Sequence, residues 1–132
     1  MGTMTGFLNR HRVGMQADLV ERNPNMDGMM AGSTHWKCRL RAGNRRMTVY
    51  FSQGPAISRE PTAEGVLNCL ASDAASVDGA RSFEEWAADL GMDADSRKAE
   101  ATFRTVERQA ANLKRLLGET AYRALLFDTE RL

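Results

Sequence analysis

Residues 36–51 of the chain read WKCRLRAGNRRMTVYF, and apolar and polar side chains alternate on both sides of a Gly43-Asn44 pair. Alternation with a period of two is typical of a half-buried β-strand, and a two-residue Gly-Asn loop between two such runs predicts a β-hairpin. If Ala42 faces Arg45, every apolar side chain of one strand lies opposite an apolar side chain of the other. A shift by one residue would destroy this agreement, so the pattern predicts the register as well as the hairpin.

This register separates two faces of the hairpin. One face is apolar, and its cross-strand pairs are Leu40 with Met47, Cys38 with Val49, and Trp36 with Phe51. The other face is polar, and its pairs are Lys37 with Tyr50, Arg39 with Thr48, and Arg41 with Arg46. Because a two-stranded ribbon alone is marginally stable in water, the apolar face needs a cover from elsewhere in the chain.

The C-terminal half of the chain supplies this cover as helices, which are indicated by capping residues and by apolar side chains three or four residues apart. The expected helices run from Pro61 to Asp78, from Ser82 to Gly91, from Asp93 or Asp95 to Leu117, and from about Thr120 to Phe127. We therefore expect an α+β fold: an antiparallel β-hairpin packed against three or four α-helices, with a third short strand as an open alternative. The expected core comprises Trp36, Cys38, Leu40, Val49, Phe51, Leu67, Leu70, Trp86, Phe103, Val106 and Leu113.

The length of 132 residues fits one domain. Residues 1–33 are expected to be a poorly ordered N-terminal segment, because they are rich in Gly and Met and contain the helix breaker Asn23-Pro24-Asn25. Within this segment, residues 13–22 have enough apolar side chains for one or two helical turns. Residues 34–132 are expected to form the single α+β domain.

Several protein classes are excluded by simple features of the sequence. The apolar runs are only a few residues long, which is too short to cross a bilayer. The basic N-terminus is not followed by the apolar stretch of a secretory signal. Cys38 and Cys69 are too few for a disulfide framework, so we expect reduced thiols in a reducing compartment, with a single bridge as the alternative.

Charge is distributed unevenly along the chain although the formal net charge is only +1. Residues 1–61 contain nine Lys or Arg against four Asp or Glu, whereas residues 62–132 contain nine against thirteen. The N-terminal half therefore has a positive field and the C-terminal half a negative one, a pattern that argues against an all-over acidic mimic of nucleic acid.

The polar face of the hairpin is the candidate binding site. The candidate residues are Lys37, Arg39, Arg41, Arg45, Arg46 and Tyr50, and no acidic residue occurs between Asp27 and Glu60. Strand alternation places Lys37, Arg39, Arg41 and Arg46 on one side, with Tyr50 beside them. Arg41 and Arg46 face each other across the ladder and repel, and an anion lying over them would relieve this repulsion. The pattern indicates a docking surface for phosphates or for an acidic protein patch. The alternative is a set of solvated arginines that keep an exposed ribbon from aggregating.

Catalysis and metal binding are not expected. Strand alternation places His35 and Cys38 on opposite faces, so they do not form a nucleophile–base pair. The sequence contains no phosphate-cradling glycine loop and no dinucleotide fingerprint. Asp93, Asp95 and Glu100 faintly resemble a calcium loop but lack its glycine, so helix capping is favoured. We expect a non-enzymatic protein with no catalytic residues, no cofactor and no metal site.

The longest expected helix carries a narrow apolar seam. Its residues are Ala99, Phe103, Val106, Ala110, Leu113 and Leu117. Such a seam can pack on the core of its own chain or on a partner helix, so the sequence leaves open a monomer or a homodimer.

Seven segments, taken in order, resemble a family. They are His35-Trp36-Lys37, MTVYFSQG at 47–54, Pro61-Thr62, VLNCLASDAA at 66–75, SFEEW at 82–86, DSRKAE at 95–100, and DTERL at 128–132. Over residues 34–132 the chain resembles small accessory proteins of tailed bacteriophages and prophages. This resemblance implies a location in the host bacterial cytoplasm and a task of binding host or phage machinery. Blocking a CRISPR effector or another defence complex that handles nucleic acid is a recurring task of such proteins.

Three functions remain as hypotheses. The first is an anti-CRISPR-like interaction protein that inhibits a host defence nucleoprotein complex through the basic hairpin face. The second is a nucleic-acid-binding protein of phage replication or transcription, and the third is a small assembly protein that dimerises through the long helix.

Overall fold

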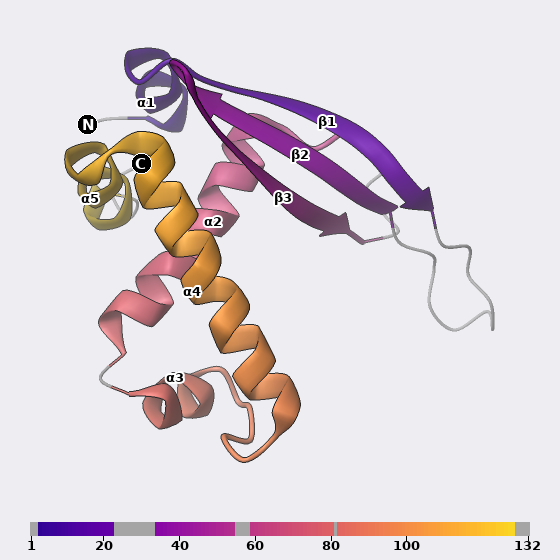
Figure 1. The fold of residues 1–132 in the computed structure, drawn as a ribbon, viewed down its shortest axis with the longest axis vertical. Coiled ribbons are helices and arrows are strands. Elements are labelled where there is room, and N and C mark those ends of the chain that lie inside the picture. Colours follow the sequence, from indigo (N-terminus) through magenta and orange to yellow (C-terminus); the bar gives the residue numbers. More distant parts are fainter. Residues whose placement is uncertain (1–2, 23–33, 55–58, 81, 129–132) are drawn as a thin grey trace.

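The fold consists of a three-stranded antiparallel sheet with helices on one of its faces. A computed structural model describes residues 3–22, 34–54, 59–80 and 82–128. In chain order the elements are α1 (Met4–Arg10), β1 (Val13–Arg22), β2 (Thr34–Ala42), β3 (Arg45–Gln53), α2 (Ala63–Gly79), α3 (Phe83–Asp89), α4 (Arg97–Leu117) and α5 (Glu119–Asp128). Figure 1 shows α2 and α4 beneath the sheet and α3 at the end of these helices that lies away from it. The expected α+β class is confirmed.

The hairpin has the predicted register at every pair. Strands β2 and β3 are antiparallel, with Ala42 opposite Arg45 and Leu40 opposite Met47. The turn between them contains Gly43 with φ of 62°, a left-handed conformation that glycine adopts without strain. Alternation and turn chemistry are local properties, which is why the sequence alone could predict this element.

The N-terminal segment differs from the expectation. Residues 4–10 form helix α1 and residues 13–22 form strand β1, so the prediction of a poorly ordered segment is wrong for this part of the chain. Helix α1 begins at Thr3, whose side chain accepts a hydrogen bond from the Gly6 amide, and it buries Phe7. The remainder of the predicted segment, residues 1–2 and 23–33, lies outside the described residues.

Strand β1 is the third strand that the sequence left open. It pairs with β2 along its whole length, from Val13 opposite Ala42 to Arg22 opposite Thr34, with a register shift between Leu19 and Glu21. The expected helical turns at 13–22 are therefore wrong, because pairing with β2 overrides a weak local preference. The sheet order β1-β2-β3 makes β2 the central strand.

The main core lies between the inner face of the sheet and the helices. It joins β2 and β3 to α1, α2, α4 and α5, and its most deeply buried members include Cys38, Leu40, Val66, Leu67, Leu113 and Leu125. A second cluster beside α3 contains Trp86, Ala87 and Val106, with Phe103 packed against it. Each expected core residue belongs to one of these two clusters or packs against it.

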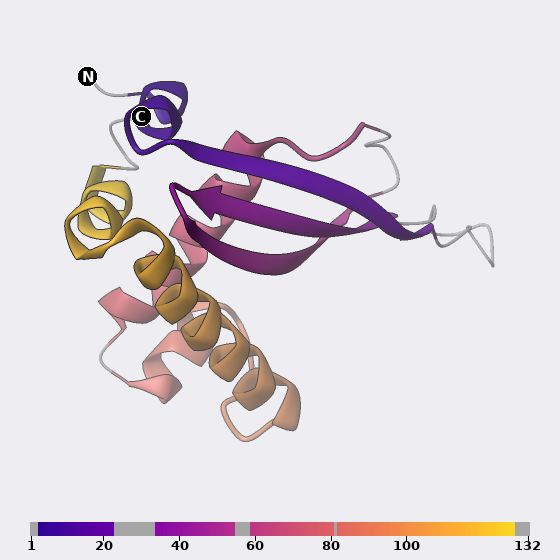
Figure 2. The same cartoon turned by 45° about the horizontal axis from the view of Figure 1, so that its top comes forward.

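Three of the expected core aromatics are only partly buried: Trp36, Phe51 and Phe103. Figures 1 and 2 show that the end of the sheet where β1 finishes projects beyond α2 and α4. Trp36 and Phe51 lie toward this end, so the helices cover them incompletely.

Serine and threonine cap the helices that the sequence anticipated. The side chains of Thr62, Ser82 and Ser96 accept hydrogen bonds from the first turns of α2, α3 and α4. The cap of α4 is therefore Ser96, and the prediction of Asp93 or Asp95 is wrong. Asp93 instead accepts a hydrogen bond from the Asp95 amide in the loop before the helix.

The seam of α4 packs within its own chain. Ala99, Val106 and Leu113 are buried, and Leu116 is buried beside them. Among the described residues, these side chains are therefore not available to contact a partner helix, which weakens the hypothesis of dimerisation through this seam. As for membranes, none of the described helices combines the length and the apolar character needed to cross one.

The Gly43 turn can be tested against a matched glycine. A side chain added at Gly43 or at Gly79 would meet no atom within 4 Å, but only Gly43 has a positive φ. We expect Gly43→Ala to lower the free energy of unfolding by about 1–2 kcal/mol, the cost of a left-handed non-glycine residue. Gly79→Ala should leave stability unchanged or raise it by less than about 1 kcal/mol. Urea unfolding measures both, and equal effects of the two substitutions would contradict the assigned turn.

Candidate anion-binding site

The face of the sheet opposite the helices carries the candidate site, and we call it the outer face. Its side chains come from all three strands: Gln16 and Asp18 from β1, Lys37, Arg39 and Arg41 from β2, and Arg46, Thr48 and Tyr50 from β3. The register arranges them in rows across the strands, namely Gly14–Arg41–Arg46, Gln16–Arg39–Thr48 and Asp18–Lys37–Tyr50. Apart from Asp18 and the partly buried Lys37, the charged members of these rows are exposed.

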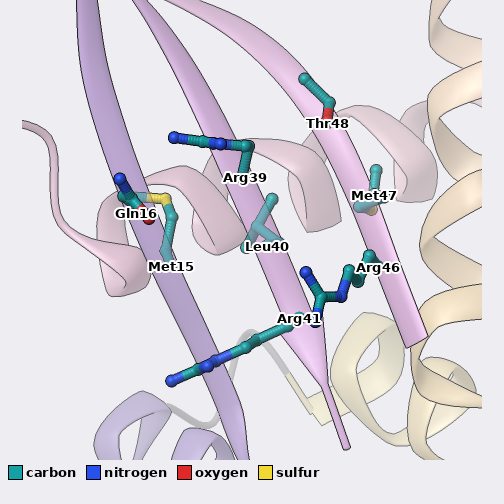
Figure 3. Close-up of a pocket in the computed structure, with 8 residues that line it drawn as sticks. All are labelled: Met15, Gln16, Arg39, Leu40, Arg41, Arg46, Met47 and Thr48. Carbon is teal, nitrogen blue, oxygen red and sulfur yellow. The ribbon is translucent and has the colours of Figure 1, made fainter. Parts of the chain in front are cut away.

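Three arginines surround one hollow on this face. The hollow has a volume of about 400 Å³, and its lining includes Arg39, Arg41 and Arg46. Figure 3 shows Arg46 reaching from β3 over β2, and Arg41 reaching from β2 over β1. Arg41 and Arg46 are opposite each other on the backbone, but both side chains extend toward β1. Their guanidinium groups therefore do not point at each other.

Glycine in β1 makes room for one of these arginines. A Cβ atom placed on Gly14 would lie 3.1 Å from the Nε atom of Arg41, which is closer than ordinary van der Waals contact. The guanidinium arm of Arg41 therefore lies across β1 at the one position of the strand that has no side chain. Gly14 therefore contributes to the site, and no sequence pattern indicated this, because its effect depends on the pairing of β1 with β2.

One carboxylate joins the basic face. Asp18 of β1 forms an ion pair with Arg39, and both side chains are about half exposed, at 46% and 49%. The sequence did not anticipate it, because Asp18 is distant from the hairpin along the chain and only the pairing of β1 with β2 places it there. An exposed pair of this kind contributes about 0–1 kcal/mol, and it partly neutralises Arg39.

The other two arginines of the hollow keep their full charge. Within the described part of the chain, neither Arg41 nor Arg46 forms an ion pair with an acidic side chain. Two unneutralised guanidinium groups on adjacent strands repel each other and attract an anion placed between them. Guanidinium forks also match the geometry of phosphate and carboxylate oxygens.

Arg45 does not lie on the outer face, although we expected it to belong to the site. Its Nη1 atom donates a hydrogen bond of 3.2 Å to the carbonyl oxygen of Arg115, near the C-terminus of α4. Helix C-termini carry partial negative charge, so a guanidinium group there is favourable. Arg45 thus connects β3 to α4, and its immediate role is structural.

A second hollow continues the positive surface around the edge of β3. It has a volume of about 390 Å³ and is lined by Arg45, Arg46, Met47, Thr48, Asn112, Arg115 and Leu116. Arg46 and Thr48 line both hollows, so they connect the outer face to the end of α4. The sequence offered no signal for Arg115, because nothing local brings that turn of the helix to β3.

Tyr50 and Lys37 occupy the positions that the sequence predicted. Tyr50 is 70% exposed and lies opposite Lys37 in the row next to Arg39. A phenol ring this exposed contributes little to folding, since it removes little apolar area from water.

The thiols of Cys38 and Cys69 lie in environments that make them less reactive than a free cysteine. Burial raises the pKa of the Cys38 thiol, and the carboxylates of Asp18 and Glu60 raise it further. Burial and then the Asp73 carboxylate raise the pKa of the Cys69 thiol on α2. Because the thiolate is the reactive form, both shifts lower reactivity near neutral pH.

His35 is a titratable side chain of the outer face, at the end away from the Gly43 turn. His35 Nδ1 lies 2.6 Å from Ser52 Oγ on the outer face, away from the buried Cys38. The residues that the structure describes contain no cluster of three or more His, Cys, Asp or Glu able to hold a metal ion.

Comparison of the chain with models of protein families, with curated proteins and with solved structures found no match.

The neighbouring arginines of β3 should differ in their effect on stability. We expect Arg45→Gln to lower the free energy of unfolding by about 0.5–1.5 kcal/mol, because it removes the hydrogen bond to the α4 carbonyl. Arg46→Gln should change stability by less than about 0.5 kcal/mol, since it removes an exposed charge that has no acidic partner among the described residues. Urea unfolding of the two variants measures this difference, and a larger loss for Arg46→Gln would contradict the assigned roles.

Alkylation should distinguish the two thiols. With iodoacetamide at about pH 8, we expect Cys69 to react more slowly than free cysteine and faster as the pH rises, because its raised pKa reduces the thiolate fraction. Cys38 should react only after unfolding, since its side chain is fully buried. Mass spectrometry of the folded and urea-unfolded protein measures both. Rapid labelling of Cys38 in the folded protein would show that the assigned core is wrong.

Proposed function

We propose that the chain is a non-catalytic binding protein that docks on an anionic partner through the outer face of its sheet. The observation that carries the proposal is the hollow of about 400 Å³ lined by Arg39, Arg41 and Arg46. Two of these guanidinium groups have no carboxylate to neutralise them in the described structure. A bound anion would replace their mutual repulsion with charge-assisted hydrogen bonds.

The partner that we propose is a nucleoprotein complex of a bacterial defence system, contacted at the phosphates of its nucleic acid. The resemblance to accessory proteins of tailed phages supports this setting, as well as a site of action in the host cytoplasm. The charge distribution supports it too, because a net charge of only +1 coexists with a basic sheet face. Such a protein presents one basic face to an anionic surface and binds it in a defined orientation.

Plaque counts test this proposal. Phage is titrated on cells with and without active CRISPR immunity, with the chain expressed in both. We expect the wild-type chain to restore plaque counts in immune cells and to have no effect in non-immune cells. The double variant Arg41→Gln/Arg46→Gln should lose this effect, because it removes the two unneutralised charges of the hollow.

The matched control removes two arginines from a different surface. Arg97 and Arg108 are exposed on α4, away from the outer face, so Arg97→Gln/Arg108→Gln changes the net charge equally. This control should act like the wild-type chain. Unchanged plaque counts with soluble wild-type protein across several immune types would overturn the proposed partner. Equal losses in the two double variants would overturn the proposed face.

A further inference from the structure

We infer that the nucleic acid contacted by the outer face is single-stranded, with one base stacked on Tyr50 and the neighbouring phosphates bound by the arginines. This inference rests on the proposed function and specifies the ligand of the same site. It is argued from the position of Tyr50, from the spacing of the rows and from the width of the sheet.

The ring of Tyr50 is available for stacking. It is 70% exposed, and the ring pairs formed within the described residues all lie elsewhere: Phe7 with His11, and Phe83, Trp86 and Phe103 with one another. Tyr50 is also the one aromatic side chain in the three rows of the outer face. An aromatic ring beside basic groups is the recurring platform on which unpaired bases stack.

Positive charges lie on the side of Tyr50 where a phosphate would be needed. Lys37 is directly opposite on β2, and Arg39, which forms the ion pair with Asp18 of β1, is diagonal to it. On an antiparallel sheet, opposed Cβ atoms are about 4.5–5.5 Å apart and diagonal neighbours about 7–8 Å apart. Both cationic side chains are long enough to reach a phosphate attached to a base that lies on the Tyr50 ring.

The rows of the outer face repeat at an interval that suits an extended strand. Residues two apart on one strand are separated by about 7 Å. The Lys37–Tyr50, Arg39–Thr48 and Arg41–Arg46 rows therefore offer a hydrogen-bonding or cationic group every ~7 Å along the sheet. Successive phosphates of one nucleic-acid strand could therefore each meet a hydrogen-bonding or cationic group of the next row.

The third strand of the sheet makes it less suited to contact bases in the major groove of a DNA duplex. The major groove of B-DNA is about 12 Å wide and admits an α-helix or a two-stranded ribbon. In this chain β2 is flanked by both β1 and β3, so the sheet is wider than a two-stranded ribbon and fits the groove less readily. A base inside a duplex would also need to be unstacked before it could contact Tyr50, at a cost of a few kcal/mol.

Fluorescence anisotropy with labelled oligonucleotides tests the inference. The probes are a single strand of about 12 nucleotides, within the usual site size of small binding modules, as DNA and as RNA, and a duplex of the same length. We expect both single strands to bind more tightly than the duplex. Tyr50→Ala should weaken single-strand binding by between about 5-fold and 150-fold, the effect of losing one stacked base.

Two control variants separate stacking from other effects. Tyr50→Phe keeps the ring and should bind like the wild-type chain. Phe127→Ala removes a comparably exposed aromatic side chain, 59% accessible, from α5 and should also leave affinity unchanged. Thermal unfolding checks that each variant folds, which is expected because both side chains are largely exposed.

The dependence on salt reports the phosphates independently of the ring. For a single strand, each phosphate contact contributes about 0.7 to the slope of log affinity against log salt. Arg41→Gln/Arg46→Gln should therefore have a shallower slope than the wild-type chain, whereas Tyr50→Ala should keep the wild-type slope at lower affinity. If the slope of log affinity against log salt is as shallow for Tyr50→Ala as for the arginine variant, the stacking role of Tyr50 is wrong.

The remaining outcomes separate this inference from the proposed function. Equal affinity for duplex and single strand, or a Tyr50→Ala variant that binds like the wild-type chain, would overturn the inference. If either of these outcomes occurs while the chain still restores plaque counts in immune cells through Arg41 and Arg46, the proposed function stands. Absence of nucleic-acid binding at low salt together with such protection would overturn both the inference and the proposed contact with phosphates, and would indicate an acidic protein surface as the partner.

Discussion

Burial of the inner side chains of β2 is the constraint on which the rest of the structure depends. Cys38 and Leu40 are almost completely removed from water, at 0% and 1% exposure, because β2 is the central strand and the helices cover it. Full burial of one large aliphatic side chain contributes about 1.5–3 kcal/mol. A slip of β2 by one residue would expose this set and bury arginines, so the register is held by the core.

The same constraint determines the outer face. Side chains alternate strictly along a strand, so once Leu40 points to the helices, Arg39 and Arg41 must point to solvent. The flanking strands then bring Asp18 and Gly14 to one side of these arginines, and Thr48 and Arg46 to the other. The unneutralised charge at Arg41 and Arg46 is thus carried by a rigid platform, and the energy of the core offsets the repulsion between them. Such preorganised charge lowers the cost of ordering side chains when an anion binds.

Adjacent arginines in the sequence have different roles because of this geometry. Arg46 points outward and lines the hollow, whereas Arg45 points to the helix layer and donates to the Arg115 carbonyl. A composition-based description treats them as one basic cluster, and the alternation of the strand separates them. Like Arg46, Tyr50 points to the outer face. Its exposed ring contributes little to the core, and its position beside Lys37 suits an unpaired base.

The amino-acid sequence by itself determined the hairpin, its register, the helices after it and the basic character of one face, because alternation, turn chemistry and capping act between near neighbours in the chain. Only the tertiary structure decided that residues 13–22 form a strand, since a β-strand is stabilised by a partner and β2 is distant in sequence. The same pairing placed the Asp18 carboxylate on Arg39 and the bare backbone of Gly14 beneath Arg41. The packing of α4 against β3 likewise drew Arg45 to the helix and brought Arg115 to the edge of the sheet. Electrostatic neighbours across a sheet or a helix interface depend on through-space contacts, and no local pattern encodes them.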